Sequence, residues 1–227
     1  MGFYLAKTPR IFMRFFSNYT WCFDSNKKEI YLTFDDGPTP EVTEFVLNEL
    51  QKYNAKATFF CIGKNIEKYP SIFKRIINEK HSVGNHTQNH FNGWKYSTED
   101  YLENVLECEN VIANEMKQLQ NYKEITLSKT LRNNKKLYRP PYGKIKSNQA
   151  KALIKNDYKI IMWNVLSGDF DTSINKEKCL QNVIRNTKNG SIVVFHDSIK
   201  ASKKLYYTLP KILKEFSKKG YLFKAIS

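Results

Sequence analysis

Short apolar segments alternate with amphipathic ones along most of this 227-residue sequence, and this alternation constrains the fold more than any other feature. Seven segments rich in β-branched and aromatic residues predict strands at 29–34, 56–61, 81–85, 136–139, 158–163, 191–196 and 221–226. Segments with apolar residues near helical spacing lie between them, at 40–54, 71–80, 97–119, 147–156, 176–187 and 209–219. The Asn- and Lys-rich residues 120–135 predict a loop. Nearly continuous apolar strands separated by helices are typical of a parallel sheet buried on both faces, so we predict an α/β fold whose sheet is closed as a barrel or left open.

The alternating pattern occupies residues 29–227, which we expect to form one domain, whereas residues 1–28 are aromatic and basic. The 41% of hydrophobic residues suffices for one buried core. Lys7, Arg10 and Arg14 interrupt every apolar run near the N-terminus, so no run of about 7–15 apolar residues resembles a signal peptide. No stretch reaches the roughly 18 apolar residues of a membrane-spanning helix. We therefore expect residues 1–28 to pack their aromatic side chains on the domain, and the protein to be cytoplasmic or peripheral at a membrane surface.

The net charge limits the kinds of partner that we expect, and the cysteine spacing indicates the state of the thiols. The sequence has 37 Lys and Arg against 22 Asp and Glu, a net charge of +15. Paired lysines are scattered over different predicted elements without a nucleic-acid-binding motif, so we expect no nucleic-acid partner, and association with an anionic glycan or an anionic membrane surface fits the charge better. No obligate protein partner is indicated. The four cysteines lack CxxC spacing and are expected to be reduced thiols.

Two adjacent carboxylates follow the first predicted strand. Asp35 and Asp36 come directly after the apolar run and precede a Gly37-Pro38 turn. Active sites of parallel α/β folds lie at the carboxyl ends of the strands, which places both acids at the functional edge. Neighbouring side chains of an extended chain point apart, so one carboxylate can hold a cation while the other faces a water. An isolated DDGP sequence is more often only an Asx-type turn, and the other motifs have to decide between the two interpretations.

A histidine pair follows the third predicted strand. His86 and His90 are two of only four histidines, and at i, i+4 on one helical turn they would be neighbours able to share a metal ion. The residues between them are Thr-Gln-Asn, so the glutamate base of an HExxH site is absent and Asp35 or Asp36 has to supply it. His81 lies at the beginning of this strand, away from its carboxyl end, and we assign it no role.

Later strand ends add three more polar groups. Arg139 opens an Arg-Pro-Pro-Tyr-Gly turn, a rigid segment that fixes the guanidinium and presents backbone N–H groups. His196 ends a predicted strand and is followed by Asp197; an imidazole suits protonation of an amine leaving group near neutral pH. Asp169 also follows a strand, although alone it would be interpreted as a surface acid.

Together these motifs resemble the polysaccharide deacetylase family with NodB homology, carbohydrate esterase family 4. The matching motifs are TFDDGP (33–38), HTQNH (86–90), RPPYG (139–143), GDF (168–170) and VFHD (194–197). The resemblance implies a single-domain, distorted seven-stranded (β/α) TIM-like barrel. It also implies a metal-dependent hydrolase that removes N-acetyl or O-acetyl groups from a carbohydrate such as chitooligosaccharide or peptidoglycan.

The same resemblance implies a role for each matching residue. The metal ligands would be Asp36, His86 and His90, holding a divalent cation that is usually zinc, with cobalt or nickel as alternatives. The implied catalytic residues are the base Asp35, the residue that orients it, Arg139, the acid His196 and the partner of that acid, Asp169. A water activated by the metal would attack the acyl carbonyl, and the backbone N–H of Tyr142 would help to hold the oxyanion.

Three residues depart from the family pattern. An acid is usual where Leu166 stands, a tryptophan where Phe170 stands and a leucine where Val194 stands. Phe170 and Val194 would line the pocket for the acyl methyl group, so the preferred acyl group stays open. Trp94 and Tyr96 could either stack on a sugar or cover the mouth of the barrel.

Two other functions stay open from the sequence. An inactive carbohydrate-binding relative is expected to have lost a metal ligand or the base, and none is lost here. A deformylase or amidase acting on a lipid-linked sugar or a small amide would use the same metal chemistry. The acid released from candidate substrates discriminates between these enzymes.

Overall fold

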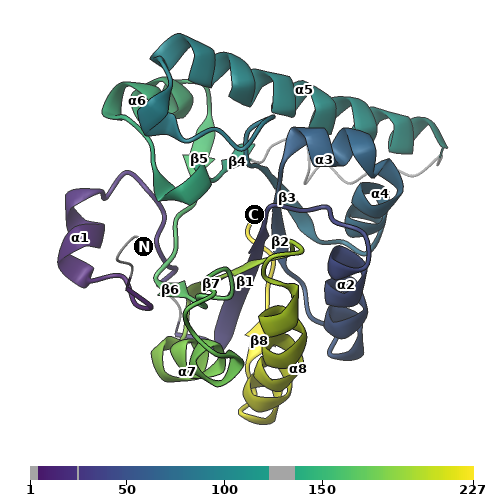
Figure 1. The fold of residues 1–227 in the computed structure, drawn as a ribbon, viewed down its shortest axis with the longest axis vertical. Helices are drawn as coiled ribbons and strands as arrows, with labels where there is room; N and C mark the ends of the chain where they lie inside the picture. Colours follow the sequence, from purple (N-terminus) through teal and green to yellow (C-terminus); the bar gives the residue numbers. More distant parts are fainter. Residues whose placement is uncertain (1–4, 25, 123–135) are drawn as a thin grey trace.

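The computed structural model describes residues 5–24, 26–122 and 136–227. Parallel strands occupy its centre and the helices surround them (Figure 1). The strands follow one another across the sheet in the order β5-β4-β3-β2-β1-β7-β6. Their bounds are β1 (Glu29–Asp35), β2 (Thr58–Cys61), β3 (Ser82–Asn85), β4 (Lys136–Tyr138), β5 (Tyr158–Ile160), β6 (Val165–Leu166) and β7 (Ser191–His196). The predicted single α/β domain with a TIM-like, seven-stranded barrel sheet is confirmed, with the sheet curled into a half-barrel.

Helices cover the outer face of this sheet. Apart from α1 (Arg10–Phe15), they are α2 (Val42–Lys52), α3 (Gly63–Lys68), α4 (Pro70–Asn78), α5 (Thr98–Tyr122), α6 (Ser147–Lys155), α7 (Lys176–Asn186) and α8 (Ser202–Lys218). Short 3₁₀ turns lie at η1 (Gly93–Lys95) and η3 (Pro141–Gly143). The predicted loop at 120–135 lies outside the described residues except for 120–122, which end α5.

Alternation along β1 determines which side chains reach the inside of the barrel. Phe34 points outward, where it stacks on Phe59 and Phe195 in the main core beneath the helices. Thr33 and Asp35 lie on the opposite, inner face, because successive residues of a strand point to opposite sides. The parallel register pairs Asp35 with His196 on β7, so both lie at the same carboxyl edge.

The structure differs from the prediction in three places. The short helix α3 was not predicted. The seventh position in the sheet belongs to the two-residue β6, whereas the predicted strand at 221–226 contributes only β8 (Leu222–Phe223), which pairs with the beginning of β1. Helix α8 begins seven residues before the predicted start at 209 and contains Pro210. Its buried leucine and isoleucine stripe packs into the core, and this packing outweighs the hydrogen bond that proline cannot make.

The N-terminal segment runs beside both edges of the curled sheet. Leu166 N–H of β6 donates to Ala6 O at 2.9 Å, and Thr20 forms a parallel bridge with Ile161, just after β5. Helix α1 lies between these two attachments, on the outside of the domain (Figure 1). Among the helices that the structure describes, none is both long and apolar enough to cross a bilayer. All four cysteines are free thiols, as predicted.

Candidate metal and catalytic site

The carboxyl end of β1 turns sharply and separates its two carboxylates. Asp36 has a φ of 83°, a left-handed conformation that is uncommon outside glycine. Its carbonyl oxygen accepts a hydrogen bond from Asn65 Nδ2 at 2.7 Å, and the next residue, Gly37, donates its N–H to Asp197 Oδ1 at 3.0 Å. A Cβ at Gly37 would lie 2.0 Å from Asp197 Oδ2, so any other residue here would displace the Asp197 carboxylate. As a result Asp35 faces the barrel interior while Asp36 faces the histidine pair.

The three predicted metal ligands converge on one point. Asp36 Oδ1 lies 3.2 Å from His90 Nε2 and 3.7 Å from His86 Nε2, and the ligand atoms of all three residues lie within 4.8 Å of one another. Although burial raises the pKa of Asp36, the imidazoles of His90, His196 and His86 outweigh it and lower this pKa well below its ordinary range. An ionised carboxylate therefore faces two imidazole nitrogens.

The segment that carries the histidines is a loop, so the predicted helical turn is wrong. Thr87 and His90 have φ values of 65° and 56°, which no α-helix contains. Side-chain hydrogen bonds hold the loop in this shape, with Thr87 N–H donating to Asn85 Oδ1 at 2.8 Å and Asn89 N–H to Asn104 Oδ1 at 3.1 Å. The two imidazoles still meet, with ring centroids 5.1 Å apart.

His86 is held in the tautomer that a metal ligand needs. Its Nδ1 lies 2.8 Å from the carbonyl oxygen of Arg139, which can only accept a hydrogen bond. Nδ1 therefore carries the proton, and the lone pair of Nε2 points toward Asp36. Burial lowers the pKa of His86 to about 4, so the ring is neutral at physiological pH.

One buried atom indicates that these residues fit a cation. Asp36 Oδ1 is buried without a hydrogen-bond partner among the described residues, although buried carboxylate oxygens are nearly always satisfied. A divalent cation between this oxygen and the two Nε2 atoms would satisfy it. Two imidazoles and one carboxylate form a ligand set that zinc binds in catalytic sites.

Arg139 and Asp35 form a buried ion pair inside the barrel. The guanidinium is fully buried, and Nη1 donates to Asp35 Oδ1 at 2.6 Å and to Thr33 Oγ1 at 2.7 Å. Nε and Nη2 donate to the carbonyl oxygens of Ile161 and Met162 at 3.1 and 3.0 Å. These contacts fix the orientation of the Asp35 carboxylate next to the metal-ligand candidates.

A second pair joins His196, the last residue of β7, to Asp169, which follows the neighbouring strand β6. His196 Nδ1 lies 2.8 Å from Asp169 Oδ1, and the backbone N–H of His196 donates to Asp169 Oδ2 at 2.7 Å. Burial alone would lower the pKa of His196, but the charge of Asp169 and its hydrogen bond, together with Asp36 and Asp35, raise it to about 10. The imidazole is therefore protonated at neutral pH and can donate a proton from Nε2.

The structure places the predicted substrate residues at unequal distances from this centre. The Tyr142 ring lies 4.6 Å from the His90 ring, and the Phe170 ring lies edge-on to His196 at 5.1 Å. Val194 is buried two residues before His196 on the same strand. Trp94 is 61% exposed, and its indole ring contacts Lys144 and Ile145, beyond the RPPYG turn.

Several residues that shape the site were missed by the sequence analysis. Asp197 accepts hydrogen bonds from Gly37 N–H and from the Thr43 hydroxyl, and so holds the turn that carries Asp36. Asn104, from the middle of α5, holds the histidine loop. Only Asp197 had a signal in the sequence, because it directly follows the strand-ending His196.

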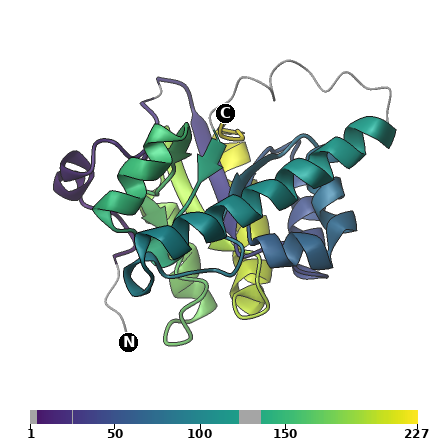
Figure 2. The ribbon, with the colours of Figure 1, turned by 90° about the horizontal axis from the view of Figure 1, so that it is seen from above.

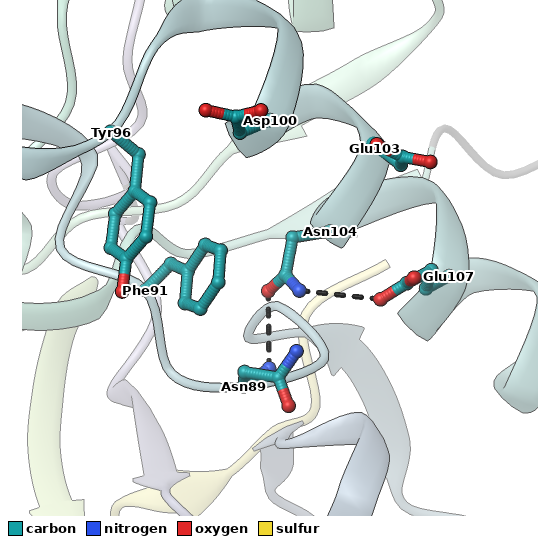
Figure 3. Close-up of a pocket in the computed structure, with 7 residues that line it drawn as sticks. All are labelled: Asn89, Phe91, Tyr96, Asp100, Glu103, Asn104 and Glu107. Carbon is teal, nitrogen blue, oxygen red and sulfur yellow. Dashed lines mark hydrogen bonds between the residues drawn. The ribbon is translucent and has the colours of Figure 1, made fainter.

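A side pocket adjoins the histidine loop. Figure 3 shows Asn89, the neighbour of His90, hydrogen-bonded to Asn104 of α5. The pocket that these residues help to line has a volume of about 340 Å³. Phe91 and Tyr96 form one wall, with parallel rings whose centroids are 3.7 Å apart. The other lining residues are Asp100, Glu103 and Glu107. One face of Tyr96 is therefore covered by Phe91.

The sequence model of the family described as polysaccharide deacetylase matches residues 24–161. The chain belongs to the polysaccharide deacetylase family. The family predicted from the five motifs is thus confirmed.

Relatives of this chain include two proteins named as peptidoglycan-N-acetylglucosamine deacetylases. A peptidoglycan-N-acetylglucosamine deacetylase of Bacillus cereus is 34% identical over 209 residues, covering 92% of this chain and 91% of that protein. Another of that name from Bacillus cereus is 36% identical over 173 residues, which are 76% of this chain and 57% of the relative. The crystal structure of the Bc1960 peptidoglycan N-acetylglucosamine deacetylase superimposes with a TM-score of 0.80 at 32% identity, covering 96% of this chain and 95% of that one. These relatives support the predicted carbohydrate deacetylase activity.

Proposed function

We propose that this chain removes the N-acetyl group from N-acetylglucosamine residues of peptidoglycan. One observation carries the proposal: a candidate Asp-His-His metal site lies at the same strand edge as two ion pairs, the buried Asp35–Arg139 pair and the partly buried Asp169–His196 pair. Hydrolysis of an amide requires a base for the attacking water and an acid for the departing amine, and these pairs offer both. The choice of sugar rests on the relatives that cover most of their own length and of this chain.

Asp36, His86 and His90 would hold the metal, which we propose to be zinc. A divalent cation in a site of this kind polarises the acyl carbonyl and lowers the pKa of a bound water toward neutrality. The neutral His86, with its Nε2 lone pair facing Asp36, is ready to bind without losing a proton.

Asp35 acts as the general base in this proposal. It takes the proton of the water that attacks the acyl carbon, while Arg139 holds its carboxylate through the 2.6 Å hydrogen bond. The remaining hydrogen bonds of Arg139, to Thr33, Ile161 and Met162, fix the guanidinium in place. A rotation of the Asp35 carboxylate would therefore break its bond to Arg139.

His196 acts as the general acid. The raised pKa keeps its proton through the neutral range, and Asp169 on Nδ1 leaves Nε2–H to face the amine that departs. Phe170 against the imidazole and the buried Val194 give the acyl methyl group an apolar surface. The backbone N–H of Tyr142, in a turn held at a φ of 61°, donates to the oxyanion as negative charge develops on it.

Acetate release from purified N-acetylated peptidoglycan tests the proposal. We expect acetate to appear together with free amines on glucosamine residues, as seen by mass spectrometry of the muropeptides. The Asp35→Asn variant should lose this activity while retaining bound zinc, because the base is removed and the metal ligands are kept. Acetate release from chitooligosaccharides or O-acetyl esters but not from peptidoglycan would contradict the proposed substrate. Release of formate from N-formylated sugars, with no release of acetate from the N-acetylated counterparts, would point to a deformylase.

A further inference from the structure

Helix α1 presents a surface that is both apolar and basic. Ile11 and Phe15, one turn apart, are 67% and 80% exposed, and Arg10 and Arg14, also one turn apart, are exposed beside them. The inward side of the helix is already used, because Met13 packs against the domain core. The outward side chains are therefore not placed to pack on the domain itself.

The neighbouring chain holds this surface in position. Phe12 packs edge-on against the buried Trp21 at 5.5 Å, and Trp21 Nε1 donates to Phe16 O at 3.0 Å. On either side of α1 the backbone is hydrogen-bonded to β6 through Ala6 and to Ile160 through Thr20. The exposed residues thus form a defined surface on an anchored helix.

The apolar area extends beyond the helix itself. Phe12 and Phe16, 47% and 40% exposed and with ring centroids 4.9 Å apart, directly follow Ile11 and Phe15 in the sequence, and Leu5, before the helix, is 47% exposed. Large apolar side chains on a surface lack the stabilisation that burial would give. Contiguous exposed apolar patches therefore mark interaction sites. Both views show α1 at the periphery of the domain, where it can meet a flat partner (Figure 1, Figure 2).

The charge of the N-terminal segment indicates which kind of partner this surface binds. Residues 5–23 contain Lys7, Arg10 and Arg14 and no acidic residue, in a chain of net charge +15. We propose that α1 docks the domain on an anionic membrane surface. Ile11 and Phe15 enter the interface between headgroups and acyl chains, and Arg10 and Arg14 contact the lipid phosphates.

Co-sedimentation of the full chain with lipid vesicles tests this proposal. We expect binding to vesicles that contain phosphatidylglycerol and phosphatidylcholine, several-fold weaker binding to phosphatidylcholine alone, and weaker binding at high salt because the charge attraction is screened. The double variant Ile11→Ser/Phe15→Ser keeps every charge and should reduce binding by about tenfold or more. Arg10→Gln/Arg14→Gln should abolish the preference for the anionic lipid.

A matched control separates this surface from general apolar exposure. Leu106, on α5, is 55% exposed, and Leu106→Ser should bind vesicles as the wild type does. Thermal unfolding of all variants checks that they are folded. Equal binding to both vesicle types, or wild-type binding by the Ile11→Ser/Phe15→Ser variant, would overturn the proposal. So would a wild-type dimer in gel filtration that this variant dissociates, because the surface would then contact a second copy of the chain.

Discussion

Replacing Asp169 by asparagine tests the role of the His196–Asp169 pair. Asp169 is fully buried, lies 2.8 Å from His196 Nδ1 and supplies the largest of the interactions that raise the pKa of this histidine from 6.5 to about 10. Asparagine has nearly the same size but no charge, so the variant removes the charge with little change in packing. The amide oxygen can still accept the hydrogen bond of Nδ1, but the amide NH₂ cannot accept the second one, from the backbone N–H of His196.

The direction in which the pH profile changes follows from the raised pKa of His196. His196 donates its proton only while it is charged, and its raised pKa keeps it charged as the pH rises toward 10. An opposite charge at this range changes a pKa by about 1–3 units. Loss of Asp169 should therefore move the alkaline limb of the kcat profile about 1–3 pH units lower, and at pH 8 to 9 the variant should lose activity that the wild type retains.

The assay is the rate of acetate release at saturating substrate between pH 5 and 11. Glu177→Gln serves as the control, because it removes one negative charge from an exposed position in the first turn of α7. That variant should keep the wild-type alkaline limb. An unchanged alkaline limb in Asp169→Asn would refute the assignment of His196 as an acid whose pKa depends on Asp169.

Three further substitutions test the packing and the support of the site. Arg139→Met leaves Asp35 buried without its counter-charge, so the free energy of unfolding in urea should fall by about 3–5 kcal/mol; wild-type stability would contradict the buried ion pair. Leu209→Ala, in the fully buried stripe of α8, should cost about 2–5 kcal/mol in the same measurement yet leave zinc affinity unchanged. Asp197→Ala should weaken zinc binding about 10–100-fold in calorimetry, because the turn that carries Asp36 loses its acceptor; unaltered affinity would exclude this supporting role.

Hydrophobic periodicity predicted the long strands of the sheet. It did not predict a strand that is too short to show a pattern and is defined only by its pairing. β1 and β7 have six or seven residues of continuous apolar or alternating character, and their bounds agree with the prediction within one residue. β6 has two residues, too few for any periodic pattern, and exists because it pairs with β7. The predicted start of the last helix at 209 was too late, because the buried residues before it continue the same apolar stripe.

The candidate site was predictable because its residues end strands. Asp35, Asp36, Arg139 and His196 each follow an apolar run, and parallel strands bring their carboxyl ends together. The shape of the histidine loop was not predictable, because Asn104 of α5 holds it from outside the motif. Spacing alone suggested a helical turn, and long-range hydrogen bonds decided otherwise.

Zinc reconstitution of the metal-stripped protein tests the central claim most directly. Acetate release from peptidoglycan is followed while zinc is added in known amounts to the stripped chain. We predict no release without metal, a rate that rises in proportion to the zinc bound and reaches its maximum at one ion per chain, and no recovery in Asp36→Asn at the same zinc concentrations. Full activity of the stripped protein, or an Asp36→Asn variant that recovers as the wild type does, would contradict a metal-dependent deacetylase built on Asp36, His86 and His90.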